Sequence, residues 1–224
     1  MRGVFVTGTD TGVGKSVIAA AICAALAARG ERVAAFKPVV TGLEDPPEGQ
    51  WPADHELLAA AAGARQRPDE VAPYAFLPSV APHYAAELAG ETIRPARILD
   101  AALTAGESAD VLVCEGVGGL LVPITWEYSV RDLAVELGLS VIVAARTGLG
   151  TISHLLLTVE AARAAGLDVA GIVMSPWPER PEPIEESNRA TVERLAGVPV
   201  SGLPPTTPAG LATAGAGLPL EDWL

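Results

Sequence analysis

The feature that most constrains the fold is a glycine-rich turn between a short apolar run and a long stretch of helix-forming residues. The turn reads Gly8-Thr9-Asp10-Thr11-Gly12-Val13-Gly14-Lys15-Ser16, between the run Val4-Phe5-Val6 and an alanine-rich stretch over residues 17–28. Backbone N–H groups at such a helix start bind anionic oxygens, the lysine reaches the outer phosphates, and the serine hydroxyl ligates Mg²⁺. The sequence therefore predicts a nucleoside triphosphate site with Mg²⁺, formed by Gly12, Val13, Gly14, Lys15, Ser16 and Val17.

The spacing of this loop departs from the usual pattern. Five residues, not four, separate Gly8 from Gly14, so the strict phosphate-loop pattern begins at Thr9. The alternative is a strand–turn–helix junction whose glycines merely allow the turn. The strand before, the helix after and the Lys-Ser pair favour the phosphate loop.

Short runs that are apolar throughout alternate with helical patterns along the chain. The expected strands cover residues 4–7, 33–37, 111–115, 141–145, 169–174 and 198–203. The expected helices cover residues 15–28, 54–62, 95–105, 130–137, 152–165 and 184–195. This alternation predicts an α/β fold with a three-layer, doubly wound, mostly parallel sheet of the P-loop NTP-hydrolase type. We expect a single domain over residues 1–224, because no linker divides the chain.

Composition narrows the class of partner. The chain carries 27 acidic and 15 basic side chains, a formal net charge of −12. This charge argues against nucleic acid and against anionic membrane surfaces as partners. Cys23 and Cys114, which lack metal-ligand spacing, are expected in the core of a reduced, cytoplasmic protein. No signal segment is visible, and the apolar run at 17–28 is shorter than the roughly 20 residues that span a bilayer.

Two charged residues stand at the ends of expected strands. Lys37 ends the second strand, and Glu115 ends the third before Gly116, Val117 and Gly118. The carboxyl edge of such a sheet carries the site, where a lysine stabilises a transferring phosphoryl group and an acid holds Mg²⁺. The alternatives are a surface lysine with a buried stem and a tight turn with an incidental glutamate.

Three further features are weaker. Asp54 precedes an expected helix, so an N-cap is its simplest interpretation, and it is a metal candidate because the loop before it opens toward the site. The stretch Gly148-Leu149-Gly150-Thr151-Ile152-Ser153 starts a helix whose N–H groups can bind a carboxylate, although an ordinary helix start is the alternative. His55, His83 and His154 form no ligand cluster, and each is expected to be a hydrogen-bonding structural residue.

Three segments interrupt the alternation of strands and helices. They are residues 41–52, residues 68–82 and the tail from Pro204 onward. The first and third directly follow strands and are therefore site candidates. The tail can equally be a poorly ordered terminus.

Taken together, these motifs resemble the dethiobiotin synthetase family. The resemblance is carried by Gly8-Thr9-Asp10-Thr11 through Gly14-Lys15-Ser16, Lys37-Pro38-Val39 through Thr41-Gly42, Ala81-Pro82-His83, Glu115-Gly116-Val117-Gly118-Gly119-Leu120 and Gly148-Leu149-Gly150-Thr151-Ile152. The family has the longer phosphate loop, which accounts for the spacing. The motifs recur in order over nearly the whole chain and weaken after about Pro176.

The resemblance implies a homodimeric, Mg²⁺-dependent carbon–nitrogen cyclo-ligase of biotin biosynthesis. Such an enzyme joins CO₂ (or bicarbonate) to 7,8-diaminopelargonate at the expense of ATP or another nucleoside triphosphate. One amine captures CO₂ as a carbamate, and the γ-phosphoryl group is transferred to it, giving a carbamic–phosphoric anhydride. The second amine then displaces phosphate and closes the ring.

The resemblance also implies roles for individual residues. Lys37, Lys15 and Thr11 are the catalytic positions, and Ser16, Asp54 and Glu115 are the metal positions. The substrate positions are Thr11, Lys37 and Thr41, together with Gly150, Thr151, Ile152 and Ser153 supplied across the dimer interface. Besides the phosphate loop, the nucleotide positions are Asp54, Glu115, Gly116, Val117, Gly118, Ser175, Pro176, Pro204, Pro205 and Thr206.

The chain departs from the family at Ser175 and Ser153, where asparagine is frequent. Serine offers fewer directed hydrogen bonds than asparagine. At Ser175, where the asparagine reads the adenine edge, we therefore expect relaxed base selection, with CTP or GTP serving as well as ATP. At Ser153 the departure affects the side-chain part of substrate carboxylate recognition.

Two other classes share features with this chain. Partitioning or septum-site P-loop ATPases carry a second lysine early in the loop, where this chain has Asp10, and they need a basic surface or amphipathic tail. Relatives of the cobyrinic acid amidases need a glutaminase domain with a nucleophilic cysteine, for which no room remains. Both fit less well than the ligase.

Overall fold

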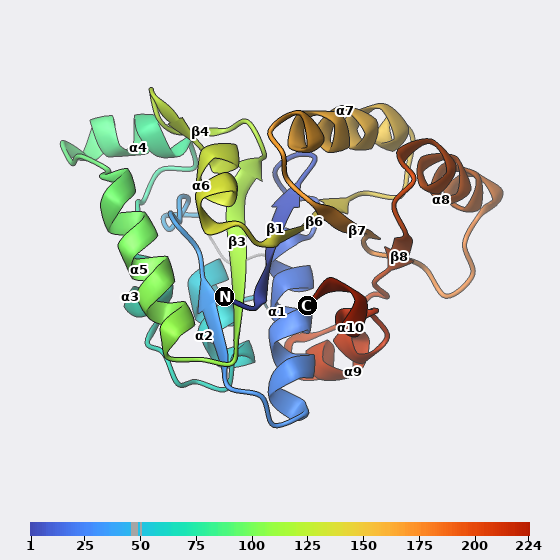
Figure 1. Ribbon diagram of the computed structural model, residues 1–224, viewed down its shortest axis with the longest axis horizontal. Helices are drawn as coiled ribbons and strands as arrows, with labels where there is room; N and C mark the ends of the chain where they lie inside the picture. Colours follow the sequence, from blue (N-terminus) through green and yellow to red (C-terminus); the bar gives the residue numbers. More distant parts are fainter. Residues whose placement is uncertain (46–48, 50) are drawn as a thin grey trace.

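The computed structural model describes residues 1–45, 49 and 51–224. Within these residues six parallel strands form one sheet in the order β2-β3-β1-β6-β7-β8 (Figure 1). The strands are β1 (Gly3–Gly8), β2 (Val33–Phe36), β3 (Val111–Gly119), β6 (Ser140–Ala145), β7 (Val169–Met174) and β8 (Val200–Gly202). The chain starts at β1 in the middle of the sheet, goes to the edge strand β2 and back to β3, and then runs outward on the other side through β6, β7 and β8. Strands on both sides of β1 confirm the doubly wound α/β fold.

Helices cover both faces of this sheet. They are α1 (Lys15–Ala28), α2 (Asp54–Ala61), α3 (Pro68–Val71), α4 (Pro82–Ala89), α5 (Pro95–Glu107), α6 (Val130–Leu137), α7 (Thr151–Ala164), α8 (Pro183–Ala196), α9 (Leu211–Ala216) and α10 (Leu220–Trp223). A two-stranded hairpin, β4 (Pro123–Thr125) with β5 (Tyr128–Ser129), precedes α6. No helix in the described ranges is long and apolar enough to cross a membrane.

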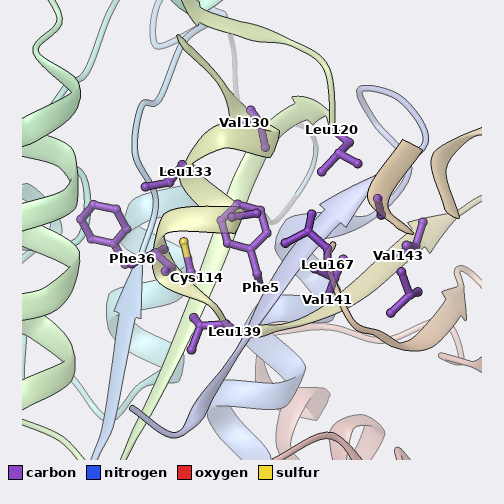
Figure 2. Packing of buried hydrophobic residues seen from close by; sticks show 14 of the residues in the cluster. Phe5, Phe36, Cys114, Leu120, Val130, Leu133, Leu139, Val141, Val143 and Leu167 are labelled. Atoms are coloured by element: carbon purple, nitrogen blue, oxygen red, sulfur yellow. The ribbon is translucent and has the colours of Figure 1, made fainter. Parts of the chain in front are cut away.

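The core consists of two apolar layers, one on each face of the sheet. Val4 and Val6 of β1 point into the layer beneath α1, α2, α9 and α10, while Phe5 points into the layer beneath α5, α6, α7 and α8. Figure 2 shows Phe5 with Cys114 and Leu133 in the second layer. Because both faces are covered, the strands carry apolar residues on both faces rather than on alternate positions only.

Both cysteines lie in these layers, as predicted. Cys23 and Cys114 are fully buried and free. Burial raises the pKa of each thiol above its ordinary value. The thiols therefore act as small apolar groups.

Several boundaries differ from the sequence prediction. The expected strand at 111–115 continues to Gly119, and the one at 198–203 shortens to β8. The proline-rich segment 68–82 contains α3 and leads into α4, since proline fits the first turn of a helix. Of the segment 41–52, residues 46–48 and 50 lie outside the described residues.

The tail is ordered, so the alternative of a poorly ordered terminus is wrong. Its helix α9 packs on α1, with Gly215 so close that a Cβ added there would lie 2.0 Å from the Ala21 carbonyl oxygen. Trp223 of α10 is buried and covers Gly171 of β7. The last helices thus complete the apolar layer around α1.

Candidate active site

The phosphate loop joins β1 to α1 and depends on its glycines. Gly12 and Gly14 have positive φ values of 68° and 89°, a conformation that glycine adopts without steric cost. A Cβ added at Gly8 would lie 2.8 Å from the Val13 side chain. Gly14 caps α1 without a side chain, so the first N–H groups of the helix remain available to an anion.

Lys15 lies folded back along this loop. It is 6% exposed, and its Nζ donates a 2.7 Å hydrogen bond to the Asp10 carbonyl oxygen. Burial lowers the pKa of Lys15 to about 8, against the opposing effect of the Glu115 carboxylate. The ammonium is therefore poorly solvated and well placed to bind an anion.

Lys37 is buried in a cluster of charged groups that also contains the buried Glu115 and the partly exposed Asp54. It directly follows β2, and its Nζ lies 2.6 Å from Asp54 Oδ2 and 2.6 Å from Glu115 Oε1. Glu115 belongs to β3, and Asp54 is the first residue of α2. Ser16 Oγ donates a 2.8 Å hydrogen bond to the same Glu115 oxygen. Because these groups converge, the alternative of a surface lysine at Lys37 is excluded.

The charged groups of this cluster shift one another's pKa values. Burial tends to lower the pKa of Lys37, but the carboxylates of Asp54 and Glu115 outweigh burial and raise it above its ordinary value. Burial raises the pKa of Glu115, which the Lys37 ammonium opposes. The pKa of Asp54 is lowered, since Lys37 outweighs the desolvation of this carboxyl group. The ammonium thus holds two carboxylates together.

The oxygen atoms of the cluster fit a magnesium ion. Mg²⁺ prefers carboxylate and hydroxyl oxygens, and Ser16, Asp54 and Glu115 supply both kinds. Glu115 Oε2 is buried and has no hydrogen-bond partner among the described residues. The described residues hold no group of three or more His, Cys, Asp and Glu suited to a metal. The candidate set is therefore two carboxylates and a hydroxyl.

The interpretation of Asp54 as an N-cap is wrong. Ala53 occupies the N-cap of α2, with no side-chain cap, and the Asp54 carboxylate points to Lys37 instead. The expected hydrogen bonds of His55 and His83 are also missing at one nitrogen each. Their Nδ1 atoms are buried without a partner in the described part of the chain, and His83 packs edge-on against Trp126.

The turn between β6 and α7 has the predicted form. Gly150 precedes Thr151 with a φ of 89°, and no side chain caps the helix. The Thr151 N–H donates a 3.3 Å hydrogen bond to the Gly148 carbonyl oxygen, whereas the N–H groups of Ile152 and Ser153 have no backbone partner among the described residues. A cleft of about 410 Å³ separates the phosphate loop from α7 and the segment 119–123. Its walls include Thr11 from the loop and Leu157 from α7.

The remaining predicted nucleotide residues follow other strands of the same sheet. Gly116, Val117 and Gly118 lie within β3, Ser175 and Pro176 follow β7, and Pro204, Pro205 and Thr206 follow β8. Ser175 is 7% exposed and faces the loop, with its Oγ 3.3 Å from a Cβ added at Gly14. Parallel strands bring these segments to one edge of the sheet.

Sequence reasoning missed two residues beside this site, Arg146 and Asn188. Arg146 directly follows β6, the same signal that indicated Lys37, and its Nη2 lies 3.5 Å from the Thr11 carbonyl oxygen. Asn188 of α8 is buried, and its Nδ2 donates hydrogen bonds of 2.9 Å to the Thr147 carbonyl oxygen and 3.1 Å to that of Gly148. No local pattern in the sequence marks Asn188.

The parallel sheet, the glycine loop and the buried lysines together define a P-loop nucleoside triphosphate-binding protein. A family model described as an AAA domain matches residues 2–209. The ATP-dependent dethiobiotin synthetase BioD of Anaeromyxobacter sp. (strain Fw109-5) is 42% identical over 197 residues, 88% of this chain and 86% of the relative. That of Bacillus subtilis (strain 168) is 36% identical over 205 residues, 92% and 87% of the two chains. The chain belongs to the family of ATP-dependent dethiobiotin synthetases.

Solved structures with the same fold include two ATPases. A ParA family ATPase from Chlorobium tepidum TLS superposes with a TM-score of 0.54 at 14% identity, covering 96% of this chain and 90% of that one. The cell division ATPase MinD of Pyrococcus furiosus gives 0.55 at 17% identity, covering 96% and 89%. At these identities the likeness shows the fold alone.

Proposed function

We propose that this chain catalyses the ATP-dependent closure of 7,8-diaminopelargonate and CO₂ to dethiobiotin, in biotin biosynthesis. The observation that carries the proposal is the pair of buried lysines, Lys15 and Lys37, beside the phosphate loop. The reaction brings two anions together, a triphosphate and a carbamate. Two fixed cations in a site of low dielectric constant are what that encounter requires.

The chemistry divides into a transfer and a ring closure. A carbamate oxygen forms a bond to the γ-phosphorus while the bridging oxygen leaves with its electron pair on the nucleoside diphosphate. The second amine then attacks the carbamoyl carbon, loses a proton and expels phosphate. Lys15 would bind the outer phosphates, and Lys37, Thr11 and Thr41 would hold the carbamate and the diamine.

Ser16, Asp54 and Glu115 would hold Mg²⁺, and the ion supplies neutralisation of the phosphate oxygens when bound. The unpartnered Glu115 Oε2 supports this assignment. Lys37 would then move from a carboxylate partner toward the reacting anions. Its long side chain allows such a shift without movement of β2.

The base of the nucleotide would lie near Ser175 and the segment 204–206. Ser175 turns its hydroxyl toward Gly14, which supports the expectation of weak base selection. We predict kcat/KM values for ATP, CTP and GTP within about tenfold of one another, because one hydroxyl discriminates poorly between base edges. Initial rates across a nucleotide panel measure this. A preference for ATP above a hundredfold would contradict it.

The substrate site would lie at a homodimer interface, with the N-terminus of α7 binding the carboxylate of the partner's substrate. Exposed leucines support an interface there: Leu121 and Leu157 line the cleft, and Leu149 precedes the N-terminus of α7. The exposed fractions are 88% for Leu149, 62% for Leu157 and 58% for Leu121. Apolar side chains exposed together beside a cleft commonly mark a contact between subunits.

The decisive test is coupling between the substrates. Phosphate release from ATP is measured with and without 7,8-diaminopelargonate and bicarbonate, and dethiobiotin is quantified by mass spectrometry. We expect release to require the diamine and to match dethiobiotin mole for mole. ATP turnover that ignored the diamine would overturn the proposal in favour of a switch ATPase.

A further inference from the structure

Arg146 is a third cation beside the phosphate loop. It directly follows β6, whose Ala144 pairs with Gly8 and accepts a 3.0 Å hydrogen bond from the Thr9 N–H. Its Nη2 lies 3.5 Å from the Thr11 carbonyl oxygen and 3.5 Å from a Cβ added at Gly12. In the described ranges no other arginine donates a hydrogen bond to residues 8–16.

The backbone beneath this side chain is fixed. Thr151 Oγ1 donates a 2.7 Å hydrogen bond to the Arg146 carbonyl oxygen. Asn188 holds the next two carbonyl groups, and Thr147 Oγ1 donates a 2.9 Å hydrogen bond to Glu185. The arginine is therefore presented from a rigid base, which reduces the entropy lost when it binds a ligand.

Most N–H groups of the Arg146 guanidinium have no hydrogen-bond partner among the described residues. Its single hydrogen bond is long, and no acid within the described residues lies within 4.0 Å to form an ion pair. A guanidinium has five N–H donors, most of which remain for an anion here. In contrast, the charge of Lys37 is already shared between two carboxylates. Even with a magnesium ion bound, the ammonium of Lys15 leaves part of the negative charge of a triphosphate uncompensated.

The position of Arg146 selects one part of that triphosphate. In such loops the lysine reaches the outer phosphates. Here Lys15 Nζ contacts the Asp10 carbonyl oxygen, and Arg146 Nη2 lies beside the carbonyl oxygen of the next residue, Thr11. We propose that Arg146 binds the terminal phosphoryl group and stabilises its charge during transfer. This inference deepens the proposed function, on which it rests only for the identity of the acceptor.

The test compares two nucleotides that differ by the terminal phosphoryl group. Binding of the non-hydrolysable ATP analogue AMP-PNP and of ADP is measured with Mg²⁺ by calorimetry for the parent protein and for Arg146→Ala. We expect the variant to lose affinity for AMP-PNP by about 10- to 100-fold and to keep its ADP affinity within about twofold, because a charged hydrogen bond to the terminal group is lost. Arg146→Lys keeps the positive charge but not the forked N–H groups of a guanidinium, so its AMP-PNP affinity should lie between those of the parent protein and Arg146→Ala.

Arg65→Ala serves as the matched control. Arg65 is exposed, and its charge helps to lower the pKa of Asp110. Asp110 directly precedes β3, at the end of the sheet opposite to the phosphate loop. Equal loss of AMP-PNP and ADP affinity in Arg146→Ala, or no loss of either, would overturn the inference. So would intact AMP-PNP affinity with only a raised KM for the diamine, which would assign Arg146 to a carboxylate. None of these binding results depends on whether the chain forms dethiobiotin.

Discussion

At the scale of single residues, Lys37 has two roles. It supplies positive charge next to the phosphate loop, and it is the counter-ion of Asp54 and of the fully buried Glu115. A buried carboxylate without a partner is costly, so removing the ammonium affects the fold as well as the chemistry. The two effects can be separated by a second substitution.

We predict that Lys37→Met lowers kcat by at least about 100-fold, as removal of a group that stabilises developing charge does. It should also lower the free energy of unfolding by about 3 kcal/mol, since Glu115 is left uncompensated. The double variant Lys37→Met with Glu115→Gln should recover stability but not activity. Urea denaturation and dethiobiotin formation measure the two effects, and near-normal activity in Lys37→Met would remove Lys37 from the mechanism.

Lys15 gives a prediction about pH. Burial holds its pKa at about 8 in the free protein, below the ordinary 10.5, and a bound triphosphate would raise it again. At pH 9 Lys15 is mostly neutral before binding and charged after it, so binding should take up close to one proton. At pH 7 it is charged in both states, and uptake by this group should vanish.

Calorimetric titration with AMP-PNP in two buffers of different ionisation enthalpy measures this uptake. Lys15→Met is the control, and it should show no difference in uptake between pH 7 and pH 9 beyond the titration of the nucleotide. Equal uptake by the parent protein at the two pH values would contradict the lowered pKa.

At the scale of elements, α1 is enclosed between the sheet and α9. Gly215 allows this contact because no side chain separates α9 from the Ala21 carbonyl oxygen. A glycine inside a helix normally weakens it. Here Gly215 permits α9 to approach α1 closely, and this contact helps to hold in place the helix that carries Lys15 and Ser16.

We predict that Gly215→Ala lowers the free energy of unfolding by about 2 kcal/mol, because the new Cβ overpacks the contact with α1. Gly217→Ala is the matched control, since its Cβ would lie 3.5 Å from the Ala214 carbonyl oxygen, an ordinary contact. Chemical denaturation of both variants measures the difference. Equal stability of the two would show that α9 shifts freely on α1.

Elements with strong local patterns were predictable from the sequence. The predicted helices at 15–28 and 130–137 match α1 and α6 to the residue, and Gly30 and Gly138 end them with positive φ. The short α9 was not predictable, since the reason for its glycine is a neighbouring helix. At the site, strand ends indicated Lys37 and Glu115. The pairing of Asp54 with Lys37 depends on a long loop, which no local pattern describes.

At the scale of the whole molecule, we propose that residues 1–224 form one domain, which the continuous six-stranded sheet supports. The exposed leucines around the cleft support the proposed dimer. Leu157 on α7 and Leu195 on α8 are each 62% exposed, but only Leu157 lines the cleft. Because the two leucines are equally exposed, substitutions at Leu157 and Leu195 differ only in whether they lie at the proposed dimer interface.

We predict that Leu157→Arg shifts the protein to a monomer and raises the KM for the diamine by about tenfold or more, because a charge buried at an apolar contact is costly. Leu195→Arg should leave both unchanged. Analytical ultracentrifugation and initial rates measure the two properties. An unaltered mass for Leu157→Arg would place the interface elsewhere.

The burial of Trp223 has a practical consequence. Its indole ring is 3% exposed and lies against Gly171, whereas Trp126 is 76% exposed. An indole in an apolar setting emits at shorter wavelength than one in water, so release of α10 from β7 would shift the emission to the red. Trp223, one of four tryptophans in the chain, would thus report by its own emission whether the last helices are docked.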